Sequence, residues 1–418
     1  MTCFMAVQKG RYDRQMAGKC QLTDPGRRSS EPRLLVLCSA QTSGIPTPNS
    51  QLAMDITALK KIHIPSLGII EGFFGRSWSW SERASYAEFL AASGYQFYIY
   101  APKDDSYLRK NWQQDWPEEN FSALQTLRET YRTRGVEFGI GLSPYEIYLN
   151  PDHNQRAALT KKIRRINELQ PDILCLLFDD MRGDLPRLAQ IQCELVQLAS
   201  ECSTARRIIF CPTYYSFDPV LEKVFGARPQ NYWQALGTGL DPQIDIFWTG
   251  PKVCSTDYPL AHLEEVTALF SRQPFLWDNY PVNDGAVKSA HLHLRAFGED
   301  RAQLSGHIAG HAVNPMNQAH LSQIPLLSLP QAYRDRGTYN SQKAFANACT
   351  QMCSPALADV LMEDVGLFQD LGLGQLGEHQ RQQLLKRYQE WAHNEPCAQE
   401  VCDWLAGLYV FDPACLTE

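Results

Sequence analysis

The stretch DILCLLFDD, at residues 172–180, is an unbroken apolar run that ends in two aspartates. Such a run, without alternation of polar residues, is typical of a parallel strand covered on both faces. Seven further runs share this character: LGIIEGFFG (67–75), YQFYIYAP (95–102), VEFGIGLSP (136–144), RIIFCPT (207–213), IDIFWTGP (244–251), PFLWDN (274–279) and SGHIAGHAVNP (305–315). Together they predict eight buried strands.

Segments with helical periodicity separate most of these runs. Apolar residues recur at i, i+3 and i+4 in residues 81–93, 118–134, 154–170, 184–202, 259–272 and 284–297. Eight strand–helix units in about 250 residues match a (β/α)8 barrel, which is an α/β fold. A doubly wound parallel sheet is the alternative. Its dinucleotide-binding form is disfavoured, since no GxGxxG follows the first run.

The two ends of the chain differ from this central pattern. Residues 1–60 are rich in Arg, Ser, Pro, Gln and Gly, show no periodicity, and predict a disordered tail. Alternatively, Met54 is the initiator and residues 1–53 are an extension of the gene model. Residues 61–325 carry the barrel pattern, and residues 326–418 predict a helical appendage, with breaks at Pro355 and at the glycines that follow.

Composition excludes several classes of protein. Of 418 residues, 44% are hydrophobic, which is enough for a large folded core. The 39 Lys and Arg against 46 Asp and Glu give a net charge of −7, the wrong sign for a general nucleic-acid binder. No stretch approaches the roughly 20 apolar residues that span a bilayer. The 13 cysteines include no CxxC pair, which argues against a metal site and a disulfide framework and favours a cytoplasmic protein.

Polar side chains gather where the apolar runs end. Barrel enzymes build their active sites at this end of the strands, so the pattern predicts an enzyme. Two vicinal pairs stand out there, Asp179–Asp180 and Asp104–Asp105, the second beside Lys103. Either pair could supply an acid and a base, because mutual repulsion keeps one carboxyl protonated. An aspartate at this place is equally typical of a helix N-cap, and spacing alone does not choose between the pairs.

Aromatic residues near the run ends indicate the kind of ligand. They are Phe73, Phe74, Trp78, Trp80, Tyr214, Tyr215, Trp248, Trp277 and Tyr280. Most are expected to fill the barrel, and a subset could stack on a sugar ring. Carboxylates, Asn, Lys and aromatics together fit a carbohydrate better than a phosphate. His307 and His311 lie in a strand-like run and are expected to be core residues rather than metal ligands.

Seven motifs occur in order along the barrel region: EGFFGRSW (71–78), YAPKDD (100–105), LLFDDM (176–181), CPTYY (211–215), WTGPKV (248–253), WDNYPVND (277–284) and NPMNQA (314–319). They resemble the catalytic domain of glycoside hydrolase family 84, which holds O-GlcNAcases, bacterial β-N-acetylglucosaminidases and proteins called hyaluronidases. The resemblance covers about residues 66–325. It implies a (β/α)8 barrel and a retaining exo-β-N-acetylglucosaminidase.

The resemblance also implies roles for individual residues. The family's catalytic pair falls on Asp179 and Asp180, and its mechanism is substrate-assisted. Asp179 would polarise the 2-acetamido group, whose oxygen attacks the anomeric carbon to form an oxazoline, and Asp180 would be the general acid and then the general base. The implied substrate-binding positions are Gly72 through its carbonyl, Lys103, Asp284 and Asn314 toward hydroxyls, Tyr215 and Asn279 toward the acetamido group, and Trp277 as a pocket wall.

No metal or organic cofactor is implied, because the substrate supplies its own nucleophile. The expected partner is a β-N-acetylglucosaminide on a glycoprotein or an oligosaccharide, with no nucleic acid and no membrane, and the helical appendage could support a homodimer. Two alternatives stay open: a non-catalytic glycan-binding barrel, and a hydrolase of another 2-acetamido glycoside.

Overall fold

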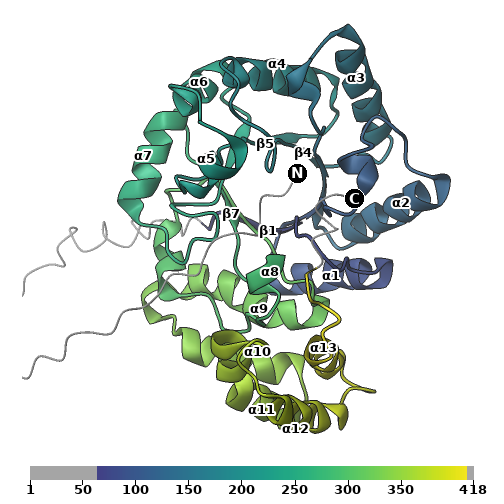
Figure 1. Cartoon of the computed structure of the whole chain (residues 1–418), viewed down its shortest axis with the longest axis vertical. Helices are drawn as coiled ribbons and strands as arrows, with labels where there is room; N and C mark the ends of the chain where they lie inside the picture. Colours follow the sequence, from purple (N-terminus) through teal and green to yellow (C-terminus); the bar gives the residue numbers. More distant parts are fainter. Residues whose placement is uncertain (1–63, 412–418) are drawn as a thin grey trace, which may run out of the picture. The chain divides into compact units, whose positions relative to one another are not determined.

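The computed structural model describes residues 64–411. Eight parallel strands follow one another around a closed barrel (Figure 1). They are β1 (Ser66–Glu71), β2 (Phe97–Tyr100), β3 (Glu137–Leu142), β4 (Ile173–Leu177), β5 (Arg207–Cys211), β6 (Asp245–Trp248), β7 (Phe275–Asp278) and β8 (Gly310–Val313). Seven lie within the predicted apolar runs, and β1 begins one residue before its run, which confirms the predicted barrel. The doubly wound alternative is wrong, because β8 pairs with β1 and closes the sheet.

The strands are buried on both faces, as their continuous apolar sequence predicts. Packing at the β7–β8 pair requires a residue without a side chain. A Cβ at Gly310 would lie 2.3 Å from ring atoms of Phe275. The ring of Phe275 therefore occupies the volume that a larger residue at position 310 would need.

Helices cover the outside of the barrel and follow most of the predicted segments (Figure 1). They are α1 (Trp80–Ser93), α2 (Glu118–Thr133), α3 (His153–Asn167), α4 (Leu188–Cys202) and α7 (Leu260–Phe270). Two short helices between β5 and β6 were not predicted, α5 (Val220–Phe225) and α6 (Tyr232–Gly239). Gly226, with a φ of 91°, ends α5, and so short an element offers little periodicity to detect.

The helix predicted over residues 284–297 is wrong for most of its length. Only Gly285–Lys288 are helical, as α8. Beyond them Leu292 and Leu294 are both fully buried, at the two-residue spacing of an extended chain. The N–H of Leu294 bonds to the side chain of Gln369 in the C-terminal region at 2.9 Å. The leucines of this segment therefore pack against the C-terminal helices instead of covering the barrel as one helical face.

The C-terminal region is helical and breaks where Pro355 and the glycines predict. It comprises α9 (Ala319–Asp335), α10 (Ser341–Met352), α11 (Pro355–Val365) with a π-helical turn at Gly366–Leu371, α12 (Glu378–Gln389) and α13 (Pro396–Leu405). The boundary placed between residues 325 and 326 lies inside α9, so the division into domains stays a proposal. Within residues 64–411, no helix is long and apolar enough to cross a membrane. The predictions for residues 1–60, including the initiator at Met54, lie outside the described residues.

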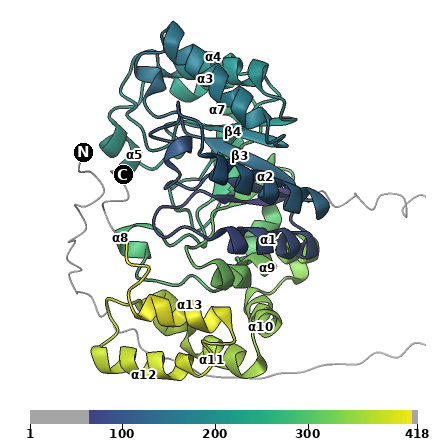
Figure 2. The same ribbon diagram turned by 90° about the vertical axis from the view of Figure 1, so that its right-hand side faces the viewer.

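In Figure 2, α13 lies among the C-terminal helices. Polar contacts join it to other described parts of the chain. The carboxylate of Glu400 accepts the N–H groups of His320 at 2.9 Å and Leu321 at 2.8 Å. These groups lie in the first turn of α9, where a helix leaves its N–H groups unpaired, so Glu400 serves as a cap supplied by another helix. Arg76, in the loop after β1, pairs with Asp403 at 3.3 Å.

Candidate active site

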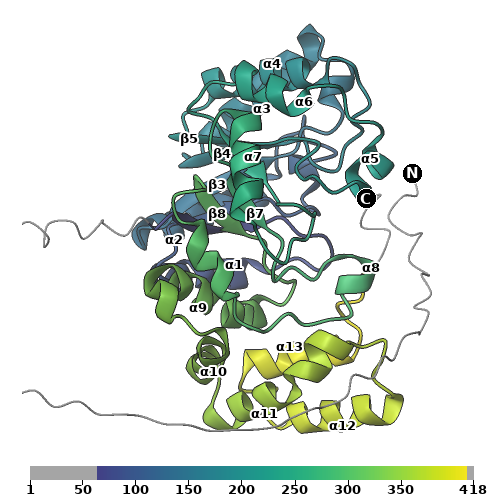
Figure 3. The ribbon, with the colours of Figure 1, turned by 90° about the vertical axis from the view of Figure 1, so that its left-hand side faces the viewer.

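The predicted site residues follow the C-terminal ends of the strands. Loops at this end carry α5 after β5 and α8 after β7, and both helices lie at the same face of the barrel (Figures 2 and 3). Asp179 and Asp180 come directly after β4 at this face. Neither caps a helix, because α4 begins only at Leu188. Asp180 has a φ of 55°, a left-handed conformation that is rare for a residue other than glycine.

Asp179 is buried and has one strong partner. Its side chain is 8% exposed, and Oδ2 accepts a hydrogen bond from the ammonium of Lys103, which is 3% exposed. Its other oxygen, Oδ1, is buried and has no hydrogen-bond donor among the described residues. Buried carboxylate oxygens normally have a partner, so Oδ1 is an acceptor aimed at something other than the protein.

Asp180 has a different environment. Its Oδ1 accepts the hydroxyl of Tyr215 at 3.1 Å, and its Oδ2 lies 4.0 Å from Lys103 Nζ. Burial raises the pKa of the Asp180 carboxyl above its ordinary value, and the charge of Asp179 adds to the rise. Lys103, Arg109 and the Tyr215 hydroxyl oppose that rise without cancelling it. The arrangement favours a protonated carboxyl group at Asp180. Next to it lies the carboxylate of Asp179, which is paired with the ammonium of Lys103.

The competing pair, Asp104–Asp105, has a structural role instead. Asp104 is exposed. The Asp105 carboxylate accepts hydrogen bonds from Trp116 Nε1 at 2.9 Å, the Tyr100 hydroxyl at 3.0 Å and the Tyr107 N–H at 2.9 Å. These bonds hold the loop that presents Lys103 to Asp179.

Asn279 connects three of the remaining predicted residues. Its Oδ1 accepts hydrogen bonds from Trp277 Nε1 and from Asn314 Nδ2, both at 3.0 Å. Its own Nδ2 donates to the carbonyl of Val253 at 2.8 Å. The Trp277 ring in turn lies 5.8 Å from Lys103 Nζ. Residues that follow β2, β7 and β8 are thereby held in one network.

Gly72, after β1, completes the wall beside Trp277. A Cβ at Gly72 would lie 2.5 Å from Trp277 Cζ2, so only glycine lets the ring take this place. The Gly72 N–H donates to Asn314 Oδ1 at 3.2 Å.

Asp284 accepts the N–H of Phe74 at 3.0 Å. Burial raises the pKa of Asp284, and the Phe74 N–H opposes the rise. Eight of the nine predicted residues thus lie in one connected set of contacts, and Asp284 joins this set only through Phe74, whose ring lies 5.8 Å from Lys103 Nζ.

A buried ionic group lies at the C-terminal end of β7, next to the predicted site residues. Asp278, the last residue of β7, accepts hydrogen bonds from Arg301 Nε at 3.0 Å and lies 3.2 Å from His311 Nε2. The other ring nitrogen of His311 is 3.0 Å from the Tyr333 hydroxyl. His311 is therefore a core residue, as expected, and burial lowers its pKa. The group fixes the main chain immediately before Asn279.

One residue at the site was not among those predicted from the sequence. Arg109, in the loop after β2, has Nη2 3.5 Å from the carbonyl oxygen of Asp180. It lies four positions beyond the YAPKDD motif, and nothing in its local sequence pattern marks it. The only signal was its place in the loop that also carries Lys103.

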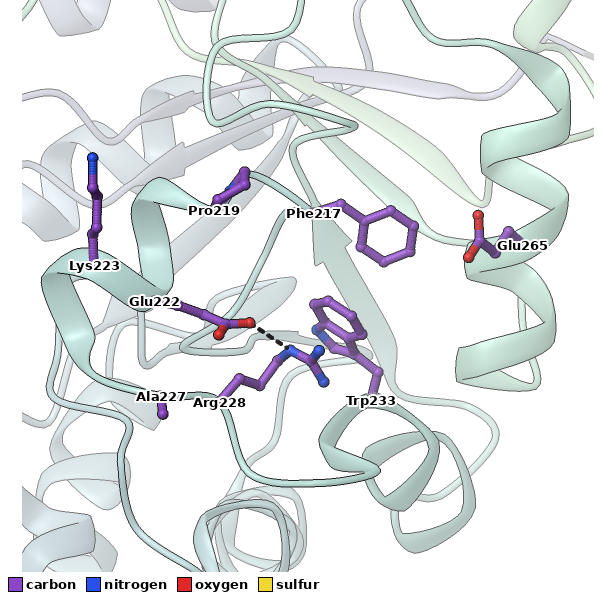
Figure 4. Close-up of a pocket in the computed structure, with 8 residues that line it drawn as sticks. All are labelled: Phe217, Pro219, Glu222, Lys223, Ala227, Arg228, Trp233 and Glu265. Atoms are coloured by element: carbon purple, nitrogen blue, oxygen red, sulfur yellow. Dashed lines mark ion pairs between the residues drawn. The ribbon is translucent and has the colours of Figure 1, made fainter.

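A separate cavity of about 610 Å³ lies among α5, α6 and α7 (Figure 4). Phe217, Trp233 and Glu265 line it, and Glu222 pairs with Arg228 there at 3.4 Å. None of the nine predicted residues lines this cavity, so it is distinct from the site described above.

Comparisons with known proteins bear on the family and the fold of the chain. A family model described as beta-N-acetylglucosaminidase matches residues 67–364. The protein O-GlcNAcases of Rattus norvegicus and Mus musculus are each 28% identical over 279 residues, which cover 64% of this chain and 30% of theirs. The chain thus matches less than a third of the length of these curated relatives.

Solved structures give the same picture. A mutant of the Thermobaculum terrenum O-GlcNAc hydrolase is 30% identical, with a TM-score of 0.65 over 81% of this chain and 74% of that one. The structure of CpGH84B, 21% identical with a TM-score of 0.66 over 83% of this chain and 67% of that one, shares the fold. On the match of the family model to most of its length, the chain belongs to the beta-N-acetylglucosaminidases of glycoside hydrolase family 84.

Proposed function

We propose that this protein is a retaining exo-β-N-acetylglucosaminidase of the O-GlcNAcase type, which removes terminal β-linked N-acetylglucosamine through an oxazoline intermediate. One observation carries the proposal: two adjacent carboxyl groups lie in opposite environments. Asp179 is paired with Lys103 and keeps a buried acceptor oxygen without a donor among the described residues. Asp180 has a raised pKa and a hydrogen bond from Tyr215.

These environments suit the two tasks of substrate-assisted cleavage. Asp179 Oδ1 accepts the N–H of the 2-acetamido group, which orients the acetamido oxygen toward the anomeric carbon. That oxygen forms a bond to the carbon while the glycosidic bond breaks, and the resulting oxazoline keeps its N–H proton as an oxazolinium ion whose charge is balanced by the Asp179 carboxylate. Asp180 gives its proton to the leaving oxygen, which needs a carboxyl that is protonated near neutral pH. The nucleophile is part of the substrate, so its attack is intramolecular and entropically favoured.

The second step returns the site to its starting state. Asp180, now a carboxylate, takes a proton from a water molecule. The oxygen of that water bonds to the anomeric carbon, and the bond from the acetamido oxygen breaks. Two inversions at the same carbon retain the β configuration. Trp277, Asn279 and Tyr215 are proposed to hold the acetamido group, and Lys103, Asp284 and Asn314 to bind sugar hydroxyls, with Gly72 contributing its carbonyl.

The relatives named protein O-GlcNAcase favour a glycoprotein as the natural substrate. A panel of aryl glycosides tests the activity and the sugar together. We expect turnover of the β-N-acetylglucosaminide, and loss of most of it, about 10²-fold or more in kcat/KM, in Asp179→Asn and in Asp180→Asn. Asp184→Asn is the matched control, because Asp184 lies close by in sequence but is exposed and paired with Arg182 at 2.5 Å.

The other outcomes decide against the proposal. Binding of N-acetylglucosamine without turnover of any glycoside would indicate a glycan-binding barrel. Preference for the N-acetylgalactosaminide would indicate another 2-acetamido sugar. Full activity in both aspartate variants would exclude the assigned roles. Comparison of an O-GlcNAc-modified protein with a chitobiose-type oligosaccharide then distinguishes the two classes of substrate.

A further inference from the structure

Arg109 reaches the site from the loop after β2, the same loop that carries Lys103. It follows the 3-10 helix η2 (Ser106–Leu108) and brings Nη2 to 3.5 Å from the carbonyl oxygen of Asp180. Its guanidinium lies near two aromatic rings, with Cζ 5.7 Å from the centroid of Phe74 and 5.6 Å from that of Tyr145. Contacts with two rings restrict the orientation of the planar guanidinium.

The residue that Arg109 contacts has a strained main chain. Asp180 has a φ of 55°, and a residue with a Cβ adopts this left-handed conformation only where its surroundings hold it. A positively charged donor near the Asp180 carbonyl favours the peptide orientation that goes with this φ. Since the side-chain direction follows from the main chain, the same contact helps to aim the carboxyl group.

Stability alone does not account for Arg109. Its other terminal nitrogen, Nη1, is buried without a hydrogen-bond partner among the described residues. A buried donor that lacks an acceptor costs free energy of folding. Features that cost stability are expected at functional sites, where they are retained for another reason.

We propose that Arg109 is a positioning residue for the carboxyl group of Asp180, acting through the Asp180 main chain and through its own positive charge. The inference rests on the proposed function of Asp180 as general acid. Arg109 does not need to touch the substrate for this role.

The charge of Arg109 predicts a measurable effect on acid–base behaviour. The charged and titratable groups that face Asp180 are Asp179, Lys103, Arg109, Tyr215, Asp284 and the thiol of Cys211 at the end of β5. Burial and Asp179 raise the pKa of Asp180, whereas Arg109 opposes the rise. Loss of the Arg109 charge therefore raises that pKa further, and the alkaline limb of the pH profile of kcat/KM moves to higher pH.

Leaving-group dependence is the most direct test. The full-length protein and Arg109→Gln are compared on aryl N-acetyl-β-glucosaminides that carry a dinitrophenol, which leaves without protonation, or a simple phenol, which needs the acid. We expect kcat/KM to fall about 10- to 100-fold with the phenol and less than about threefold with the dinitrophenol. Arg109→Lys keeps the charge, so its alkaline limb should stay in place while the phenol is still cleaved more slowly.

Arg228→Gln is the matched control. Arg228 lies over Trp233 at 3.8 Å and its Nε pairs with Glu222 at 3.4 Å, and it belongs to the separate cavity of Figure 4. Loss of the Arg228 side chain should not lower kcat/KM for one of the two glycosides more than for the other. Equal losses on both substrates in Arg109→Gln, with an unmoved alkaline limb, overturn the positioning role. Absence of turnover in the wild type overturns the proposed function instead. If Arg109→Gln does not fold, Arg109→Lys serves as the test. A kcat/KM for the phenol glycoside equal to that of the wild type in this variant overturns the inference.

Discussion

Lys103 and Asp179 form a buried ion pair at the mouth of the barrel, with 3% and 8% of their side chains exposed. The pair joins the loop after β2 to the end of β4, two strands that are not neighbours in the barrel. Little water reaches either group, so each is neutralised chiefly by the other. Only one oxygen of Asp179 is used, and the second remains as a buried acceptor.

Replacement of Lys103 by Met should destabilise the protein by about 3–5 kcal/mol, because Asp179 would be left as an uncompensated buried charge. The double variant Lys103→Met with Asp179→Asn should recover much of this loss, since neither charge then remains. Urea denaturation of the four proteins in this cycle measures the coupling. Strictly additive effects would show that the two side chains do not depend on each other.

Replacement of Tyr215 by Phe should move the alkaline limb of the kcat/KM profile to higher pH. The Tyr215 hydroxyl bonds to Asp180 at 3.1 Å and opposes the rise in its pKa. Without this bond the carboxyl keeps its proton to a higher pH. Tyr214→Phe is the control, because the Tyr214 hydroxyl bonds instead to the Gly226 carbonyl at 2.7 Å. An equal shift in both variants would contradict the assignment.

The barrel was predictable because its strands have a simple physical requirement. Neighbouring residues such as Leu174 and Cys175 point to opposite faces of β4 and are both buried, so the sequence has no polar alternation. Parallel strands of a barrel also end at one face, and this brings Asp179 and Trp277 to the same site although they are far apart in the chain. Position at a strand end made both residues candidates, and the resemblance to the family then selected them.

Other features depend on geometry that the pattern of residues does not contain. The contact between Arg109 and Asp180 requires a particular loop path, and Arg109 has no motif of its own. The pattern of residues left the choice between the two aspartate pairs open, and only the family resemblance favoured Asp179 and Asp180. The hydrogen bonds that occupy the Asp105 carboxylate, from Trp116 and Tyr100, were not contained in the pattern. Residues 284–297 were misassigned because their leucines have a tertiary partner, the C-terminal helices, that local periodicity does not reveal.

Replacement of Gly72 by Ala should impair catalysis more than folding. The added Cβ would lie 2.5 Å from Trp277 Cζ2, so the indole must move, and its hydrogen bond to Asn279 would be strained. Overpacking of this kind costs about 1–3 kcal/mol, whereas a shift of about 1 Å in a binding group can cost about 10²-fold in rate. Steady-state kinetics and thermal unfolding of Gly72→Ala and Gly337→Ala separate the effects, because a Cβ at Gly337 meets nothing within 4 Å. Wild-type kcat/KM in Gly72→Ala would show that the indole position is unimportant.

Replacement of Glu400 by Gln should change how stability depends on pH. Burial raises the pKa of Glu400 from 4.5 to about 8. The folded protein therefore binds more protons than the unfolded chain between these values, and its stability falls as pH rises through this range. The variant has no titrating group at this position, so its free energy of unfolding should fall less, by about 1–3 kcal/mol, between pH 5 and pH 8. Urea denaturation at the two pH values measures this difference, and Glu390→Gln, at an exposed position, should behave as the wild type. The same fall in all three proteins would mean that Glu400 is charged at both pH values and that its two bonds to the first turn of α9 outweigh its burial.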